Sequence, residues 1–227
     1  PILMPLHQSL AANQIESIVG ILNGTTNYIL SQMTETGVNY ANALADAQKQ
    51  GFAEADPTND VCGFDAARKL AILSSIGFRA NVTFDDVLVE GIEKIDKSDI
   101  QYAKDMGYTI KLLTVALRQE NGIALNVYPA FLPDNHPLSS VKGAYNAIYV
   151  TGNIVDDVMF YGRGAGALPT ASAVMGDVIS TAQHILNGST GTGMIMTDTK
   201  RIPFYSSLKL QNSYYFRLDV DDVTGVL

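Results

Sequence analysis

Two apolar segments that flank an Asn-Gly pair constrain the fold of this 227-residue chain more than any other feature. Residues 109–118 are nearly continuous in Ile, Leu, Val and Thr, and residues 123–128 alternate, with the large aliphatic side chains on one side. Asn121-Gly122 between them is the strongest short signal for a β-hairpin. A strand that is apolar on both faces is usually covered on both sides, by helices or by another subunit. The sequence therefore predicts a buried hairpin.

The other expected elements follow in an order that limits the fold class. A second strand pair is expected at residues 146–150 and 154–161, around a turn at residues 151–153. The first third reads as helical, and one more helix is expected late in the chain: residues 8–20, 28–36, 40–50, 61–76 and 170–187. Helices followed by at least four strands favour an α+β fold, with a mixed, largely antiparallel sheet covered by helices, over a doubly wound sheet.

Composition and charge exclude several classes of protein. Apolar residues make up 47% of the chain and charged residues 17%, below the ~25% of an average soluble domain, so disorder is not expected. The net charge of −8 argues against nucleic acid and anionic membranes as partners. No apolar run reaches the ~18 residues of a membrane span. Cys62 is the only cysteine, which excludes an intrachain disulfide and fits a cytoplasmic location.

Both ends of the sequence suggest a piece of a longer protein. The chain opens at Pro1 rather than Met, and no basic segment followed by an apolar core marks a signal peptide there. It stops on the apolar pair Val226-Leu227 without a polar tail. We therefore expect the parent protein to extend beyond these residues.

Asp65 and Lys69 stand out in the helix expected at residues 61–76, because most of its other side chains are apolar. They are four residues apart, so they lie on one helix face and can form an ion pair. A charged pair on a buried face carries a desolvation cost that calls for a reason such as chemistry. A lysine in that setting can donate or accept a proton. The alternative is an ordinary surface ion pair of little energetic consequence.

Acidic residues just upstream enlarge this candidate site. Glu54, Asp56 and Asp60 lie in the segment that enters the helix, where they can converge with Asp65 and Lys69 on a substrate ammonium or hydroxyl. Their spacing is not that of a calcium-binding EF-hand. The three histidines, at positions 7, 136 and 184, lack zinc-ligand spacing. We therefore expect no bound metal.

The same segment carries a resemblance to a known family. Residues 47–69 resemble the signature of homoserine dehydrogenase, whose defining positions are filled in order by Gly51, Asp56-Pro57, Asp60, Gly63, Asp65 and Lys69. Residues 23–28 look like that family's substrate-side loop, and residues 162–166, before Pro169, look like its late glycine turn. The three motifs occur in the family's order over residues 1–188.

The resemblance implies a reaction and a set of roles. The family reversibly reduces L-aspartate 4-semialdehyde to L-homoserine with NADPH or NADH, in the biosynthesis of threonine, methionine and isoleucine. Carried over position by position, Lys69 is the catalytic proton donor to the aldehyde oxygen, and the base in reverse. The other matched positions have binding roles: Glu54, Asp65, Asp60, Asn23, Gly24 and Thr25 for the substrate, and Gly51 and Gly166 for the cofactor.

The resemblance also defines what this chain lacks. Members of the family begin with a Rossmann dinucleotide-binding domain, and no strand and Gly-rich turn of that kind precedes residue 1. The family's sodium site lies just before residue 1, so its ligands are not in this chain. The resemblance implies that NADP or NAD is bound mainly by the absent domain. We therefore expect the isolated chain to have little or no activity, and expect a homodimer.

The domain prediction divides the chain into three parts. Residues 1–188 are expected to form the substrate-binding, catalytic and dimerisation region, and residues 189–212 a Gly/Thr/Ser-rich linker. Residues 213–227 resemble the start of an ACT domain, a small regulatory amino-acid-binding fold, with a strand at residues 214–220. Two other readings stay open: a non-catalytic amino-acid-binding regulatory module, and another NAD(P)-dependent enzyme with the same layout.

Overall fold

A single six-stranded sheet organises the protein in the computed structural model, which describes residues 2–189, 202–205, 210–218 and 220. The strand order is β2-β4-β3-β1-β5-β6. The strands are β1 (Ile15–Ile21), β2 (Leu88–Val89), β3 (Tyr108–Gln119), β4 (Gly122–Pro133), β5 (Tyr145–Gly152) and β6 (Asp156–Arg163). Only the β2–β4 pair is parallel. The predicted mixed, largely antiparallel sheet is confirmed.

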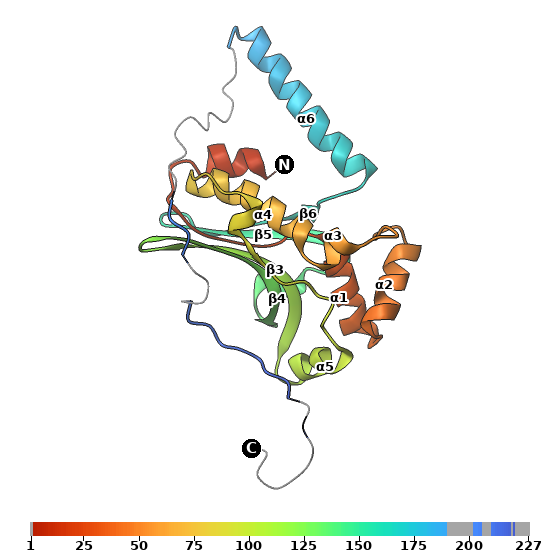
Figure 1. Cartoon of the computed structure of the whole chain (residues 1–227). Coiled ribbons are helices and arrows are strands. Elements are labelled where there is room, and N and C mark those ends of the chain that lie inside the picture. Colours follow the sequence, from red (N-terminus) through yellow and green to blue (C-terminus); the bar gives the residue numbers. More distant parts are fainter. Residues whose placement is uncertain (1, 190–201, 206–209, 219, 221–227) are drawn as a thin grey trace.

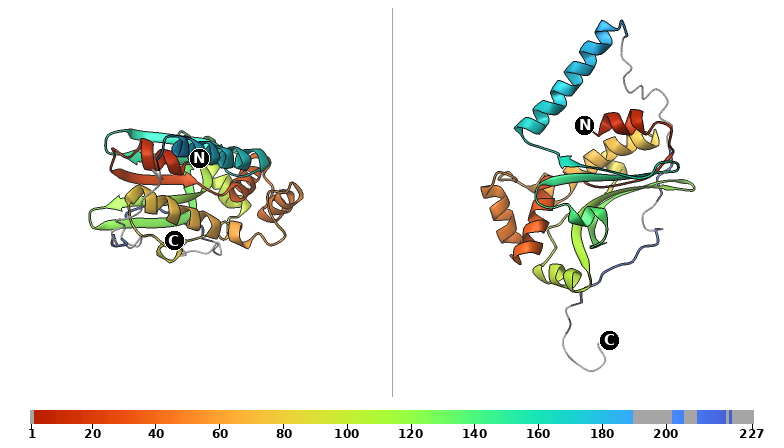
Figure 2. Two further views of the ribbon diagram at one scale, coloured as in Figure 1. Left: turned by 90° about the horizontal axis from the view of Figure 1, so that it is seen from above. Right: turned by 180° about the vertical axis from the view of Figure 1, so that it is seen from behind.

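Helices surround this sheet unevenly. The α-helices are α1 (Gly24–Thr36), α2 (Tyr40–Lys49), α3 (Thr58–Val61), α4 (Phe64–Phe78), α5 (Lys97–Asp105) and α6 (Ala167–Leu186), with short helical turns η1 (Pro5–Ser9), η2 (Phe84–Asp86) and η3 (Pro137–Ser140). In Figure 1, η1 and α4 lie over one sheet face, while α1 and α2 lie at one end. Helix α6 projects away from the sheet in Figure 1 and in the right view of Figure 2, and it buries none of its residues.

The predicted hairpin is the longest strand pair. β3 and β4 pair continuously from Tyr108 opposite Pro133 to Gln119 opposite Gly122, with Glu120-Asn121 as the turn. Strand β4 runs five residues beyond the predicted end at Tyr128. The second predicted pair is also confirmed as β5 and β6. Local alternation and turn residues were therefore sufficient to find four strands.

The helix predicted at residues 8–20 is wrong from residue 10 onward, because only residues 8 and 9 are helical and residues 15–20 belong to β1. β1 is an inner strand, and Ser17 pairs with Leu117 on one side and Thr151 on the other. Gly20 looked like a helix end, but a Cβ there would lie 3.0 Å from the carbonyl oxygen of Ala147. Because the partner strands β3 and β5 lie far downstream in the sequence, with Ser17 paired to Leu117 and to Thr151, the short local pattern carried no sign of them.

The helix predicted at residues 61–76 is two helices. The chain breaks at Cys62-Gly63 between α3 and α4, where Gly63 has a φ of +83°. A Cβ on Gly63 would lie 3.1 Å from Val89 and 3.2 Å from Val127. Both conditions favour glycine, and the turn redirects the chain so that Val61 leaves the face shared by Asp65 and Lys69.

The two faces of the sheet carry separate apolar clusters. The larger cluster joins the sheet to the helices around Ile18, Leu70 and Ile123. The smaller cluster, on the opposite face, is centred on Leu113, Val115 and Leu138. Several residues packed against this second cluster are only partly buried: Val19, Leu117, Tyr128, Ala130, Tyr145, Tyr149 and Met159. The described part of the chain therefore covers the second face incompletely.

The structure describes only part of the C-terminal region for which predictions were made. Most of the predicted linker 189–212 lies outside the described residues, as do residue 219 and residues 221–227 of the ACT-like segment. The strand predicted at 214–220 is wrong over its described part, because residues 214–218 form no strand. There the ring of Tyr215 stacks on Phe131 at 4.5 Å, and Arg217 pairs with Asp99 at 2.8 Å. Side-chain contacts hold this segment in place of a strand ladder.

No helix in the described ranges is long and apolar enough to cross a membrane.

Lys111 on β3 is almost completely buried, with 2% of its surface exposed. Its Nζ donates to Asn27 Oδ1 at 3.0 Å and to the carbonyl oxygen of Val141 at 2.5 Å. Burial lowers the pKa of Lys111 to about 8, despite the opposing charge of Glu35. The native protein therefore binds fewer protons than the unfolded chain between pH 8 and the ordinary lysine value of 10.5.

This shift predicts a pH-dependent stability. The penalty for burying the charge is fully present below pH 8 and disappears as the pH rises toward 10.5, so the free energy of unfolding increases over this interval. Between pH 7.5 and 9.5 the wild type is expected to gain about 2 kcal/mol relative to Lys111→Met, by urea denaturation. Lys104→Met, at an exposed lysine of α5, is the control and should follow the wild type. Parallel pH profiles for wild type and Lys111→Met would contradict the assignment.

Candidate active site

Asn23, between β1 and α1, links the starts of three helices. Its Oδ1 accepts a hydrogen bond from the backbone N–H of Thr26 at 2.8 Å and caps α1. Its Nδ2 donates to Asp60 Oδ1 of α3 at 2.7 Å and to Asp65 Oδ2 of α4 at 2.9 Å. The side chain is only 5% exposed. Three residues predicted for the substrate site, Asn23, Asp60 and Asp65, are therefore brought into direct contact.

Lys69 joins the same cluster through Asp65. Its Nζ lies 2.6 Å from Asp65 Oδ2 and donates to the carbonyl oxygen of Leu22 at 3.1 Å. The side chain of Lys69 is 50% exposed and that of Asp65 is 32% exposed. The expectation that this pair lies on a buried stripe is therefore wrong, because the turn at Gly63 sets α4 with this face toward solvent. The ammonium is held at two points and remains accessible to a reactant.

Gly24 and Thr25 position the cluster from the first turn of α1. A Cβ on Gly24 would lie 2.9 Å from the carbonyl oxygen of Ala144, so only glycine allows this approach. Thr25 Oγ1 donates to the carbonyl oxygen of Phe52 at 2.6 Å and pins the loop after α2 to α1. Because that hydroxyl proton is already committed, Thr25 connects the predicted substrate-side loop to the loop after α2.

The loop pinned by Thr25 carries two predicted residues that stay apart from the cluster. The Glu54 carboxylate makes no hydrogen bond or ion pair with the described part of the chain and is exposed, while its backbone carbonyl accepts from Gln48. Gly51 follows α2 with a φ of +76°, and no atom lies within 4 Å of its would-be Cβ. The structure leaves Glu54 free to meet a ligand.

The glycine turn predicted at residues 162–166 is the last predicted element; its first two residues end β6, so the turn itself is Gly164–Gly166. Gly166 precedes α6 with a φ of +118°, a conformation that favours glycine. Its carbonyl accepts from the backbone N–H of Thr170 in the first turn of the helix. The exposed backbone at this turn suits close approach by a flat ligand.

Sequence reasoning missed two residues beside these segments. Asn146 on β5 donates from Nδ2 to the carbonyl oxygen of Ile21 at 3.0 Å. Tyr28 donates to Asp46 at 2.6 Å, which raises the pKa of Tyr28 to about 12, and its ring packs on Phe52 at 4.6 Å. Asparagine is depleted in strands, so its presence in the predicted strand 146–150 was a usable signal. Tyr28 closes the predicted substrate-side loop at residues 23–28, but nothing local indicated its contacts with Asp46 and Phe52.

Cys62 lies near the cluster without the properties of a nucleophile. Its Sγ donates to Glu93 at 3.0 Å, and this hydrogen bond, together with burial, raises the pKa of the thiol to about 11. No group of three or more His, Cys, Asp or Glu side chains among the described residues is arranged to hold a metal ion. The chemistry available here is that of the ammonium and the carboxylates.

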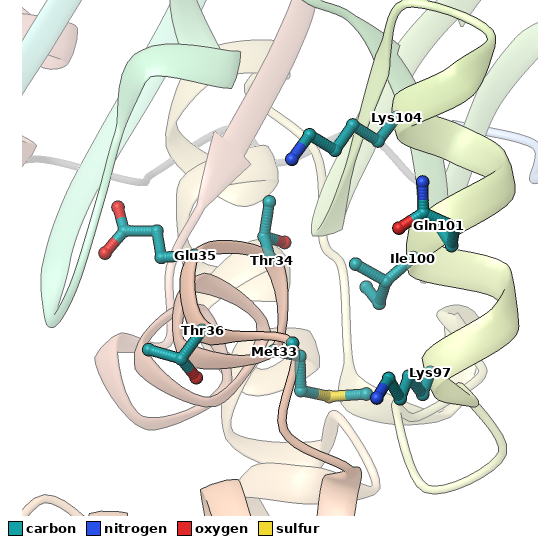
Figure 3. Close-up of a pocket in the computed structure, with 9 residues that line it drawn as sticks. Met33, Thr34, Glu35, Thr36, Lys97, Ile100, Gln101 and Lys104 are labelled. Atoms are coloured by element: carbon teal, nitrogen blue, oxygen red, sulfur yellow. The ribbon is translucent and has the colours of Figure 1, made fainter.

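A cavity of about 250 Å³ lies elsewhere, at the opposite end of α1 from Asn23 (Figure 3). It separates the last turn of α1, with Glu35, from Lys97 and Lys104 of α5. These charged side chains are exposed, and Glu35 already pairs with Lys142 at 3.0 Å. The Asn23 cluster, with its mutually bonded polar side chains, is the better candidate site.

The linkage through Asn23 predicts an unusually costly substitution. Asn23→Ala removes a helix cap and also leaves Asp60 and Asp65 without their shared donor, so we expect a loss of about 3 kcal/mol in the free energy of unfolding. Asn39→Ala removes only the cap of α2, where Asn39 accepts from the N–H of Asn42, and should cost about 1 kcal/mol. Urea denaturation of both variants tests this, and equal losses would show that the carboxylate contacts contribute nothing.

Comparison with known proteins shows what this chain is similar to. The family model described as homoserine dehydrogenase matches residues 1–179. A homoserine dehydrogenase of Synechocystis sp. is 53% identical, with 100% of this chain covering 54% of that protein. The crystal structure of a homoserine dehydrogenase from Thiobacillus denitrificans aligns with a TM-score of 0.86 and 41% identity, over 90% of this chain and 48% of that one.

A more distant solved relative is a hyperthermophilic archaeal homoserine dehydrogenase mutant in complex with NADPH, with a TM-score of 0.68 and 27% identity. It is covered over 52% of its chain, and 81% of the present chain aligns with it. The present chain thus spans about half the length of the curated relatives it matches. The match covers the candidate site and nearly all of the described elements. The chain belongs to the homoserine dehydrogenase family.

Proposed function

We propose that this chain is the substrate-binding and catalytic region of an NAD(P)-dependent homoserine dehydrogenase, which reversibly reduces L-aspartate 4-semialdehyde to L-homoserine. The observation that carries the proposal is the position of Lys69, held by Asp65 and the Leu22 carbonyl and still half exposed. Its natural place is the biosynthesis of threonine, methionine and isoleucine. The activity belongs to the whole protein. This chain spans about half the length of its relatives.

Lys69 is the group that moves the proton. Reduction of an aldehyde builds negative charge on its oxygen, and a positioned ammonium stabilises that charge and protonates it. In the reverse direction the neutral amine takes the proton from the hydroxyl of homoserine. Asp65, at 2.6 Å from Nζ, holds the ammonium in place for either direction. The carbonyl of Leu22 limits its rotation from the other side.

The carboxylates recognise the amino acid part of the substrate. Asn23 uses both amide protons on Asp60 and Asp65 and its oxygen on the start of α1, so its role is to hold these groups in place. Each of the two carboxylates has a second oxygen outside these contacts. We propose that these oxygens and Glu54 bind the ammonium and hydroxyl of homoserine, because a cationic amine is the natural partner of clustered carboxylates.

The residues at the edge of the site fit a nicotinamide cofactor. Gly51 has an uncovered backbone with no neighbour at its Cβ position, and Gly166 has an exposed backbone of positive φ. Such positions let a flat ring approach the main chain closely. The cofactor, NADP or NAD, supplies the hydride when bound. This chain holds the carbonyl carbon and its oxygen in place for that transfer, and its Lys69 donates or accepts the proton.

The remaining parts of the chain have distinct proposed roles. Residues 1–188 form the catalytic and dimerisation region, 189–212 a linker, and 213–227 the start of an ACT-like regulatory domain. The isolated chain is expected to have little or no activity. Its relatives are about twice as long, and Gly51 and Gly166 alone offer too little surface to bind a dinucleotide.

We also propose that the protein is a homodimer through the second sheet face. That face is apolar and only partly covered, and the residues there include Leu117, Tyr149 and Met159. A two-fold axis brings such a face against its own copy. Burying it completes the cover over β1, β3 and β5, and β1 is the strand that leads into the candidate site.

The proton-transfer role predicts the kinetics of a lysine variant. In the full-length protein, Lys69→Met is expected to lower kcat for homoserine oxidation by about 10³-fold, because general acid–base catalysis is lost, while cofactor affinity is retained. Lys94→Met, at an exposed lysine after β2, is the matched control and should keep wild-type kcat. A Lys69→Met enzyme within a few-fold of wild type would move the catalytic role to another residue.

The dimer proposal predicts a change of oligomeric state. Sedimentation of the full-length protein at micromolar concentration should give a dimer, and Leu117→Glu should shift it toward monomer by placing a charge in the apolar face. Met106→Glu, at an exposed position after α5, serves as the control and should remain dimeric. A monomeric wild type would refute the proposal, and a Leu117→Glu dimer would place the interface elsewhere.

A further inference from the structure

Asn146 occupies the junction between two segments of the site that are far apart in sequence. Its Nδ2 donates to the carbonyl oxygen of Ile21, the last residue of β1, at 3.0 Å. The loop that follows carries Leu22 and Asn23, which hold Lys69 and the two carboxylates. Asn146 therefore fixes the backbone immediately before the substrate side of the site.

The other edge of the Asn146 amide faces the glycine turn. A Cβ built on Gly164 would lie 2.5 Å from Asn146 Oδ1 and 2.9 Å from Asn146 Cγ. Asn146 Oδ1 also lies 3.6 Å from the Cβ position of Gly24, at the start of α1. The amide thus fills the space between the turn and the loop, and a residue larger than glycine at 164 would force this amide to shift.

This close approach is specific to one glycine of the segment. Gly162, two residues earlier on β6, is the strand partner of Asn146, yet no atom lies within 4 Å of its Cβ position. At Gly166 the nearest atoms belong to Pro169, its own helix turn. Gly164 alone depends on Asn146. Gly162 therefore serves as a control for Gly164, because a Cβ at 162 would meet open space and a Cβ at 164 would meet Asn146.

We propose that Asn146 is a positioning residue that sets the separation between the glycine turn and the loop after β1. The turn follows β6 and the loop follows β1, strands that are not neighbours in the sheet, since β5 lies between them. Asn146 lies on that intervening strand and touches both. That the turn faces the cofactor and the loop faces the substrate rests on the proposed function, whereas the contact itself does not.

The consequence for catalysis is alignment of the two reactants. Each segment binds its own ligand, so a change in their separation should leave both ligands bound but misaligned. Errors of this kind reduce the rate of the chemical step, because reactivity falls steeply with misplacement of about 1 Å. We therefore expect substitutions at this junction to lower kcat more than they raise the KM of homoserine or the Kd of the cofactor.

The test is a double-mutant cycle in the full-length protein. The variants are Gly164→Ala, Asn146→Ala, the double variant, and Gly162→Ala as control. Gly164→Ala should lower kcat at least about tenfold, with less than about threefold change in homoserine KM and in NADPH Kd measured by fluorescence. Gly162→Ala should stay within about twofold of wild type. In the Asn146→Ala background, Gly164→Ala should cost less than about twofold more, because the amide that it meets is gone.

Thermal unfolding of the same variants separates this proposal from the proposed function. The midpoint should fall for Gly164→Ala and should show the same coupling with Asn146→Ala, whether or not homoserine is oxidised. An inactive wild type would refute the proposed function, with the coupling still read from the midpoints. Equal effects of Gly164→Ala in the two backgrounds, or equal effects of Gly164→Ala and Gly162→Ala, would overturn the role of Asn146.

Discussion

The hydrogen bonds of one asparagine amide hold the candidate site together. The Oδ1 of Asn23 accepts a hydrogen bond from a backbone N–H in the first turn of α1, and its Nδ2 donates to carboxylates on α3 and α4. Without that shared donor, Asp60 and Asp65 would repel each other next to the one ammonium that Asp65 binds. The position of Lys69 therefore follows from Asn23, through Asp65, and so does the proposed chemistry.

The strand that leads into Asn23 gives this arrangement its rigidity. β1 lies inside the sheet, bonded to β3 and β5, so its last residues cannot move independently of the core. Its end is then held by two side chains, Asn146 on the carbonyl of Ile21 and Lys69 on the carbonyl of Leu22. A site on the end of an inner strand is well placed for a reaction that demands fixed geometry.

What could be predicted from the sequence depended on the range of the interaction. The β3–β4 hairpin and the Asp65–Lys69 pair were found because alternation, Asn-Gly and a four-residue spacing are local. The break at Gly63 was missed, since the reason for it lies partly in Val89 and Val127 of other strands.

Contacts between distant segments were beyond local reasoning. β1 was read as helix because its partners, β3 and β5, lie far downstream in the sequence. The resemblance to homoserine dehydrogenase put Asn23, Asp60 and Asp65 into one substrate site. It did not reveal that Asn23 bridges the two carboxylates, or that Thr25 is committed to Phe52. The family was recognisable from the sequence, whereas these hydrogen bonds were visible only in the structure.

The central claim, that the Lys69 ammonium transfers the proton, is tested most directly by chemical rescue. Lys69→Ala in the full-length protein leaves a space that small primary amines can enter, so added methylamine or ethylamine should restore part of the homoserine oxidation rate. The account predicts that the restored rate depends on the concentration and the pKa of the amine, as expected for general base catalysis. A rate that is unaffected by any amine, or already high without one, would contradict it.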